Sequence, residues 1–408
     1  MPSASGASRS GTIPLRPETE LLFCCARVRL GGAVAERCRS LVRLGLDWEM
    51  VVEQARRHGV DPLLCRHLMT IDEPSIPAWV RKRLRGHFET NAVRNRLMTA
   101  ELSKVLARLG DERIAAIPYK GPVLARTAYG DVALRRFADL DVLVRRAEVF
   151  RAVAALRELG YEPRLRLTRA QERALLALQC EYPLDRDRGR LTTEIHWDVV
   201  PRDFAFHLDL DRFWSAARPM QLDGLTMLTP SPEDLLLILV VHGAKHFWAR
   251  LAWLVDVAAA IEAHPDIDWS TLLARAQKRG AARMLAVALT VVSDLLGVVV
   301  PDRVSQQIAA DHAAAVLAQR VTGWLAGAPI PAERSLGALR ASMALRERRR
   351  DRVAHLCRTT LTPTIEDWAS IRLPAPLLPA HYLLRPFRLA AKRGAMMLKR
   401  SDSSRDRP

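Results

Sequence analysis

Two aspartates separated by one residue, Asp139 and Asp141, begin a short apolar run that ends at Val144. Side chains alternate between the two faces of a β-strand, so both carboxylates point the same way while Leu140 and Val142 point into a core. Two carboxylates side by side repel each other, and a divalent cation bound between them removes that repulsion. The triplet predicts a metal site on a strand, although solvated acids at a sheet edge produce the same spacing.

A third carboxylate lies in a second alternating run, in which Glu194 and His196 share one face of the expected strand. Three carboxylates on adjacent strands can hold two Mg²⁺ ions (or Mn²⁺), which would position a triphosphate and activate a hydroxyl for in-line attack. His196 could orient one of these carboxylates or act as a base. A buried histidine with satisfied hydrogen bonds fits the same position.

A candidate phosphate-binding loop precedes the aspartates. The apolar run from Ile114 to Tyr119 is typical of a buried strand, and a helix can begin after it with Pro122 in its first turn. Gly121 lets the backbone approach a phosphate closely, and the helix N-terminus attracts an anion. Lys120 adds a point charge. We therefore expect Lys120 and Gly121 to contact a phosphorylated ligand.

Four further residues are candidates for ligand contact. Arg135 could clamp a phosphate beside the metal, or be a solvated loop arginine. His242 and His246 are four residues apart on an expected helix and can share a face, with Lys245 beside them. This spacing suits zinc, but no glutamate follows His242, so the HExxH arrangement of metallohydrolases is absent. Core or capping roles for the two histidines fit equally well.

The periodicity of apolar residues predicts a small α/β unit between two helical regions. The expected regions are a disordered leader (1–15), an N-terminal helical region (16–110), the α/β core (111–229), a helical domain (230–330), a basic C-terminal region (331–400) and a disordered tail (401–408). The fold class is therefore α+β, with a small mixed sheet flanked by helices.

Individual elements within these regions follow from local signals. Two short helices meet at Gly59, and Ser231 is the expected N-cap of a later helix. The other expected elements are a long helix over 79–109, a helix over 148–159, and strands over 140–144, 165–167, 181–184, 191–197 and 222–228. The strands over 181–184 and 191–197 form a hairpin, and 222–228 adds an edge strand.

Positive charge is concentrated at the C-terminal end of the 408 residues. The formal net charge is +17, and residues 331–408 hold 17 Lys and Arg against seven Asp and Glu, a net +10. The segment 373–400 mixes leucines with Tyr382, Phe387 and basic residues, which favours peripheral contact with an anionic membrane. A tail that packs its leucines on the domain is the alternative.

Other classes of protein are less compatible with the sequence. Aromatic residues make up only 6%, and RNP and zinc-finger signatures are absent, so nucleic acid is a weaker candidate partner. The sequence has no GxxxxGK[ST] loop and no CxxC pair, and no apolar run of signal-peptide type follows Met1. Six irregularly spaced cysteines suit the reducing cytoplasm, where we expect the protein, with membrane-peripheral association through its C-terminal segment.

The ordered set of motifs resembles the DNA polymerase β-like nucleotidyltransferase superfamily, and more narrowly the bacterial family called uncharacterised nucleotidyltransferase. The motifs that carry the resemblance are Tyr119-Lys120-Gly121, Tyr129-Gly130-Asp131, Arg135, Asp139-Leu140-Asp141, Glu194-Ile195-His196-Trp197, the run 242–248, the run 250–256 and the tail 368–389.

This resemblance implies that Asp139 and Asp141 are the metal pair, that Glu194 is the third acid and that Gly121 shapes the phosphate loop. It implies Mg²⁺-dependent transfer of a nucleoside monophosphate from a nucleoside triphosphate to an unknown acceptor, in bacterial natural-product or polysaccharide biosynthesis.

One departure from the superfamily pattern is Lys-Gly-Pro at 120–122, where the superfamily usually has Gly-Ser or Gly-Gly. That departure motivates the alternative of a catalytically degenerate scaffold that binds a phosphorylated ligand. A basic protein that binds nucleic acid or a membrane surface is a second alternative.

Overall fold

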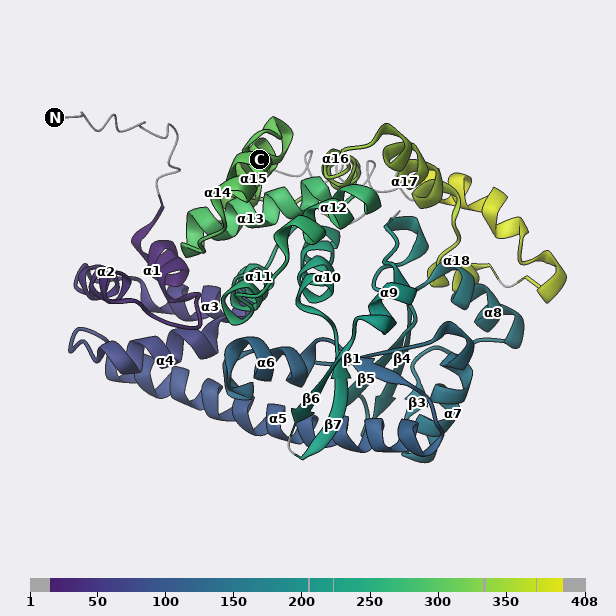
Figure 1. Ribbon diagram of the computed structural model, residues 1–408, viewed down its shortest axis with the longest axis horizontal. Helices are drawn as coiled ribbons and strands as arrows, with labels where there is room; N and C mark the ends of the chain where they lie inside the picture. Colours follow the sequence, from purple (N-terminus) through teal and green to yellow (C-terminus); the bar gives the residue numbers. More distant parts are fainter. Residues whose placement is uncertain (1–14, 205, 223, 333–334, 372, 392–408) are drawn as a thin grey trace, which may run out of the picture.

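The protein is a mainly helical molecule built around one small β-sheet (Figure 1). The computed structural model describes residues 15–391, apart from 205, 223, 333–334 and 372. The expected leader, except Leu15, and the expected tail over 401–408 lie outside the described residues. Helices lie on both sides of the mixed sheet, which confirms the predicted α+β class.

The first half of the chain contains the N-terminal helices and the sheet. Its elements are α1 (Pro17–Cys25), α2 (Gly32–Val42), α3 (Trp48–His58), α4 (Asp61–Ile71), α5 (Ala78–Asp111), β1 (Ala116–Pro118), α6 (Gly121–Tyr129), β2 (Leu140–Val144), α7 (Val149–Glu158), β3 (Glu162–Pro163), α8 (Arg169–Leu178), β4 (Glu181–Arg186) and β5 (Leu191–His196). Short 3₁₀ turns lie at Val132–Leu134 and Arg146–Glu148.

The second half is helical after one hairpin. Its elements are α9 (Leu210–Ser215), β6 (Arg218–Leu222), β7 (Leu225–Thr229), α10 (Pro232–Lys245), α11 (Leu251–Ala263), α12 (Trp269–Arg279), α13 (Ala282–Leu296), α14 (Asp302–Ala309), α15 (His312–Leu325), α16 (Leu336–Ala344), α17 (Arg349–Leu361) and α18 (Ile365–Ser370). Residues 380–391 are also helical.

The five-stranded sheet has the order β1-β2-β5-β4-β3. β2 and β5 pair in parallel, and the other neighbouring strands are antiparallel. β4 and β5 form the predicted hairpin, whose tip contains positive φ angles at Asp187, Arg188 and Gly189. The parallel pair places β2 beside β5 although the two strands are almost 50 residues apart in the sequence.

Two predicted strands differ in the structure. Residues 165–167 are not a strand, because the pairing with β4 occurs earlier, at Glu162 and Pro163, and the chain then leads to the Thr168 cap of α8. The segment 222–228 is not an edge strand of the main sheet. It turns back on itself, so that β6 and β7 form a separate two-stranded hairpin.

Several helix boundaries follow from local chemistry. The Asp47 side chain accepts a hydrogen bond at the start of α3, and Gly59 ends that helix with a φ of +73°. Ser231 caps α10 as predicted, by accepting from the backbone N–H of Asp234. Such caps satisfy backbone groups that a helix end leaves unpaired.

The long helix α5 holds the loop that leads into β2. Its Asn95 side chain donates to the carbonyl oxygens of Val132 and Arg135, at 2.6 and 2.7 Å, and Asn91 donates to that of Ala133 at 2.8 Å. Buried amides are stable only when such partners are present. α5 therefore fixes the backbone immediately before Asp139.

Two hydrophobic clusters form the interior. The first packs α1–α4 against α10, α11, α13 and α15, so the N-terminal helices and the helices after residue 230 share one core. The second packs the C-terminal half of α5 and α7 against the sheet.

One guanidinium in the basic C-terminal part is buried. Arg346, the first residue of the charged run 346–352, is 1% exposed and donates to the carbonyl oxygen of Phe204. A guanidinium can be buried when its donors find such partners. Within the described residues, no helix combines the length and the apolar character that crossing a membrane requires.

The buried His58 predicts a loss of stability in mild acid. Its Nδ1 accepts from the backbone N–H of Leu251 at 3.3 Å, and burial, together with Arg57 and Arg250, lowers its pKa to about 4. In the unfolded chain the His58 ring is protonated near pH 6.5, whereas in the folded protein it is protonated only near pH 4. The free energy of unfolding should therefore fall by up to about 3 kcal/mol between pH 7 and pH 4 through this residue.

Denaturant titrations of the wild type and of His58→Gln at pH 7 and near pH 4 measure this contribution. Gln keeps an acceptor but cannot be protonated, so the variant should lose less stability over this range. Equal losses in the two proteins would show that His58 does not contribute.

Candidate metal and nucleotide site

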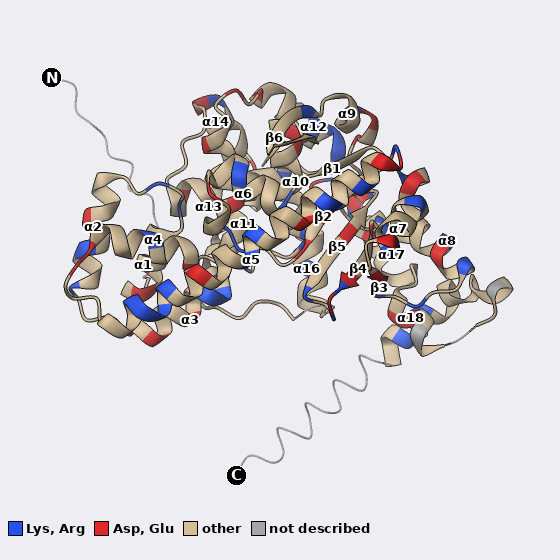
Figure 2. Cartoon of the chain, turned by 90° about the horizontal axis from the view of Figure 1, so that it is seen from below, with Lys and Arg blue, Asp and Glu red and all other residues tan. Residues whose placement is uncertain are grey.

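The sheet brings the predicted carboxylates together on one face. Asp141 on β2 is paired in register with Glu194 on the parallel strand β5, and Asp139 directly precedes β2. Acidic positions on β4 and β5 are visible in the middle of the molecule (Figure 2). Burial, followed by the charges of Asp141 and Glu194, raises the pKa of Asp139 to about 6.

Lys120 compensates part of this negative charge. Its Nζ lies 3.2 Å from Oδ1 of Asp141, and the two side chains are only 13% and 4% exposed. Burial alone would raise the pKa of Asp141, but Lys120 and His196 outweigh it, so this pKa is well below its usual value. The pKa of Lys120 is raised, since Asp141 and Asp139 outweigh the effect of burial. Both groups are therefore charged.

His196 lies between two sets of acidic and thiol groups. Its Nε2 is 3.2 Å from Oδ1 of Asp141 and 3.4 Å from Oε2 of Glu194, and its Nδ1 is 3.8 Å from Oε2 of Glu181. Neither nitrogen has an aligned hydrogen-bond partner among the described residues, although the ring is 3% exposed. Burial lowers the pKa of His196, but the groups around it, Asp141 first, raise it well above its usual value. The acidic neighbours thus favour the protonated ring in the metal-free protein.

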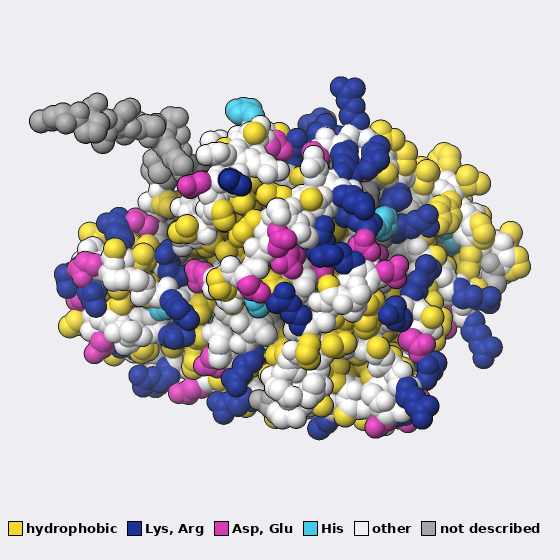
Figure 3. All heavy atoms as spheres, in the orientation of Figure 1, with side chains coloured by type: hydrophobic (Ala, Val, Ile, Leu, Met, Phe, Trp, Pro, Cys, Tyr) yellow, Lys and Arg dark blue, Asp and Glu magenta, His cyan; other side chains and the backbone are white. Residues whose placement is uncertain are grey.

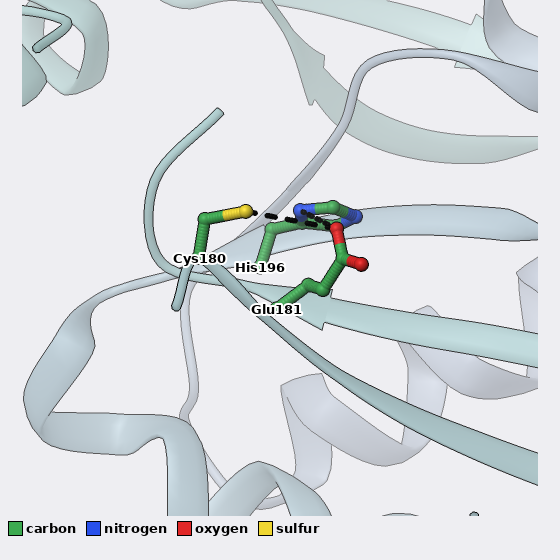
Figure 4. A group of neighbouring side chains, drawn as sticks. All are labelled: Cys180, Glu181 and His196. Carbon is green, nitrogen blue, oxygen red and sulfur yellow. Dashed lines mark hydrogen bonds and ion pairs between the residues drawn. The ribbon is translucent and has the colours of Figure 1, made fainter. Parts of the chain in front are cut away.

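The sequence interpretation missed Cys180 and Glu181, which meet the Nδ1 side of His196 (Figure 4). Glu181 is opposite His196 in the β4–β5 register, and burial and Glu181 raise the pKa of the Cys180 thiol. The predicted hairpin could have indicated Glu181, because Glu181 is the first residue of β4 and shares a face with the residue paired with it on β5, His196.

Among the residues that the structure describes, two groups of side chains have donor atoms close enough to hold a metal ion, within 4.8 Å of one another in each. They are Asp141, Glu194 and His196, and Cys180, Glu181 and His196. Carboxylate oxygens are the ligands that Mg²⁺ and Mn²⁺ prefer, and Asp141 and Glu194 of the first group supply them, whereas Asp139 belongs to neither group. The buried carboxylates and the unaligned nitrogens of His196 also indicate a site built for a charged ligand.

The phosphate-loop candidate lies against the backbone of the aspartates. α6 begins at Gly121, which has a φ of +52°, and a Cβ at this position would lie 3.3 Å from the carbonyl oxygen of Asp139. Glycine meets both demands, since it accepts positive φ and leaves room for the neighbouring chain. The helix N-terminus and the aspartate strand are therefore held together by close packing.

The structure gives Arg135 a partner that neither sequence interpretation anticipated. Its Nε and Nη2 contact the two carboxylate oxygens of Asp256 at 2.7 and 2.9 Å, and the Tyr129 hydroxyl donates to the same carboxylate at 2.7 Å. The Arg135 side chain is 10% exposed, so the alternative of a solvated loop arginine is wrong. Contact between its remaining Nη1 and a phosphate stays a prediction.

The end of α10 faces the same site. The ring centroids of His242 and His246 are 5.0 Å apart, and burial followed by the charge of Lys120 lowers the pKa of His242 well below its usual value. Lys245 is close enough to Glu181 to lower the pKa of that carboxyl, although burial opposes the change. These three predicted ligand contacts therefore lie near the carboxylates, and their binding role stays a prediction.

Replacing Gly121 with alanine should disturb the site more than a comparable change elsewhere. The variant forces alanine into positive φ, at a cost of about 1 kcal/mol, and adds a close contact with the Asp139 backbone. Gly130→Ala is the matched control, because Gly130 has a φ of +75° but nothing within 4 Å of an added Cβ.

Denaturation of both variants, with and without Mg²⁺, measures the difference. Gly121→Ala should be the less stable and should lose stabilisation by Mg²⁺, whereas Gly130→Ala should keep it. Equal behaviour would show that the close approach to Asp139 does not position the carboxylates.

Comparison with known proteins supports a family assignment. The search of curated proteins and the search of solved structures each gave no match. The family described as "Uncharacterised nucleotidyltransferase" matches residues 45–297, a range that runs from the N-terminal helices through the sheet to the end of α13. The match contains all the carboxylates, Lys120 and Gly121, and the end of α10. The chain therefore belongs to the uncharacterised nucleotidyltransferase family.

Proposed function

We propose that the protein is a Mg²⁺-dependent nucleotidyltransferase (Mn²⁺ can replace Mg²⁺) that transfers a nucleoside monophosphate from a nucleoside triphosphate to an acceptor hydroxyl or phosphate. The register of Asp141 with Glu194, with Asp139 two residues before Asp141, is the observation that carries the proposal. Family membership supports the same class of chemistry.

Asp139, Asp141 and Glu194 would hold the metal ions, which supply positive charge at the attacking and leaving oxygens of the α-phosphate. Lys120 and the N-terminus of α6 would bind the outer phosphates, since a buried cation and free backbone N–H groups favour an anion there. His196 would stay protonated and orient Asp141 and Glu194. Lys120 would exchange its contact with Asp141 for the phosphates when a metal ion arrives.

In the transfer step, the acceptor oxygen forms a bond to the α-phosphorus as the bond to the bridging oxygen breaks, and pyrophosphate leaves. We assign the proton of an acceptor hydroxyl to Glu194, because its side chain is 17% exposed and reaches the face from the neighbouring strand.

A sharp test is Asp139→Asn, alone and with Asp141→Asn. The raised pKa of Asp139 means that its charge destabilises the metal-free fold, so Asp139→Asn should gain on the order of 1 kcal/mol without metal. The same variant should lose the thermal stabilisation by nucleotide with Mg²⁺, since a ligand that binds only the native state raises apparent stability. Thermal unfolding of both proteins across a panel of nucleoside triphosphates measures the two effects.

Asp187→Asn is the control, because Asp187 lies at the hairpin tip with a φ of +53°, which asparagine tolerates. Normal Mg²⁺-dependent nucleotide binding by the double variant would refute the proposal. Tight binding without pyrophosphate release with any acceptor would instead favour the degenerate scaffold that the Lys-Gly-Pro sequence suggests.

We also propose that the C-terminal segment contacts an anionic membrane surface. Leu383 and Phe387 are 74% and 76% exposed on the helix over 380–391. The opposite side of this helix is tied inward, because Arg385 contacts Asp367 of α18. Hydrophobic side chains gather over this end of the molecule (Figure 3). The net +10 of residues 331–408 suits acidic lipids, where each basic residue near the surface contributes about 1 kcal/mol.

Leu383→Asp with Phe387→Asp should abolish sedimentation with vesicles rich in phosphatidylserine. Neutral phosphatidylcholine vesicles should bind neither protein, because the charge attraction is absent. The control is Leu44→Asp with Leu97→Asp, which changes two leucines outside the segment that are 64% and 65% exposed. Unchanged sedimentation of the first variant would exclude this surface as the contact.

A further inference from the structure

A groove lined by arginines lies beside the carboxylates, between the end of α3, the middle of α5, the loop 135–138 and the start of α11. Its volume is ≈ 990 Å³. We call it the arginine groove and define it by Arg56, Arg57, Arg94, Arg136, Arg250 and Trp253. A cavity of this size accommodates a small-molecule substrate.

The groove carries an excess of positive charge. Two acids line it, Glu53 and Asp256, and both oxygens of Asp256 are already occupied by Arg135. Arg136 pairs with Asp61 at 3.1 Å. In residues 15–391 as described, Arg56, Arg57 and Arg250 form no ion pair. Converging guanidinium groups without carboxylate partners are suited to a ligand with several negative charges.

An aromatic surface forms one side of the groove. The Trp253 ring stacks on His246, with centroids 5.0 Å apart and an angle of 30° between the planes. The Arg250 guanidinium lies 5.9 Å from the centre of the Trp253 ring. The groove therefore offers a flat apolar face next to its cations, as is common where a ring-containing ligand carries charge.

The walls of the groove are held in place by packing between distant parts of the chain. His58 accepts from the backbone of Leu251, and a Cβ added to Gly59 would lie 3.3 Å from Cβ of Ala252. The last turn of α3 is thus pressed against the first turn of α11. This contact fixes the spacing between Arg56 on one wall and Arg250 on the other.

The groove reaches the segment directly before the proposed metal site, although none of the site's carboxylates lines it. Phe137 and Ala138 line it, and the next residue is Asp139. His246 lines it too, and the charge of Lys120 contributes to the lowered pKa of His246, after burial and Lys245. A ligand in the groove is therefore adjacent to the carboxylates but uses cations other than Lys120.

We propose that the arginine groove binds the acceptor, and that the acceptor is a small phosphate-bearing molecule. This inference rests on the proposed nucleotidyl transfer. The donor triphosphate has its own partners in Lys120, the start of α6 and the metal ions, so the unpaired arginines serve the second substrate. A free hydroxyl or phosphate of the acceptor would attack the α-phosphorus, pyrophosphate would leave, and any hydroxyl proton would pass to Glu194.

Calorimetry measures the binding of inorganic tripolyphosphate in EDTA and about 150 mM salt. Because EDTA removes metal ions, this binding tests the groove without the metal-dependent donor site. Arg56→Gln with Arg250→Gln should weaken this binding at least about tenfold, because two charge-assisted contacts are lost. Arg303→Gln with Arg320→Gln removes the same net charge from exposed positions outside the groove and should have little effect. Circular dichroism verifies that both variants fold.

A second arm measures nucleoside triphosphate binding with Mg²⁺. The groove variant should keep wild-type affinity there, since the donor uses other residues. An equal loss of tripolyphosphate binding in the two arginine variants would show nonspecific attraction and overturn the proposal. A parallel loss of Mg²⁺-nucleotide binding in the groove variant would place the donor in the groove and overturn the assignment to the acceptor.

A third arm uses a short single-stranded RNA. If the groove variant loses RNA binding while tripolyphosphate binding is unchanged, the ligand is a nucleic acid and the small-acceptor proposal is wrong. The proposed nucleotidyl transfer is tested by a different measurement. Normal nucleotide binding by the double variant Asp139→Asn with Asp141→Asn would refute it, so the two proposals can be refuted independently.

Discussion

Repulsion among carboxylates on one face of the central sheet is the constraint that organises this protein. Asp139, Asp141 and Glu194 are brought together by the pairing of β2 with β5, in surroundings with little water. Buried charges of one sign are stable only with compensation. The fold supplies it by placing Lys120 and a protonated His196 against Asp141, and metal ions would complete it.

The elements around the sheet each serve this arrangement. The two asparagines of α5 fix the loop before β2, and the close approach at Gly121 sets α6 against the aspartate strand. At the end of α10, a Cβ on Gly243 would lie 2.3 Å from Nε1 of Trp248, so the turn that carries His246 needs this glycine. The site is thus positioned by backbone contacts as much as by side chains.

Local pattern was sufficient to predict β2, the β4–β5 hairpin, the end of α3 at Gly59 and the N-cap of α10, because alternation and capping act over a few residues. It also predicted which face of β2 and β5 carries the carboxylates. It could not reveal Asp256 as the partner of Arg135, since the two residues are 121 positions apart and nothing in either neighbourhood encodes the other. The arginine groove was missed for the same reason, because its walls come from helices that only the tertiary fold brings together.

The Arg135–Asp256 pair also has a consequence for synthesis of the chain. A ribosome makes the sheet strands and the loop of Arg135 well before α11, and a charged guanidinium enters a protein interior only together with its counter-charge. Until Asp256 has emerged, the Arg135 guanidinium has no counter-charge and must stay hydrated, although Asn91 and Asn95 of α5 are already present to hold the backbone of its loop. Burial of the Arg135 side chain therefore has to wait for a helix that contributes none of the carboxylates.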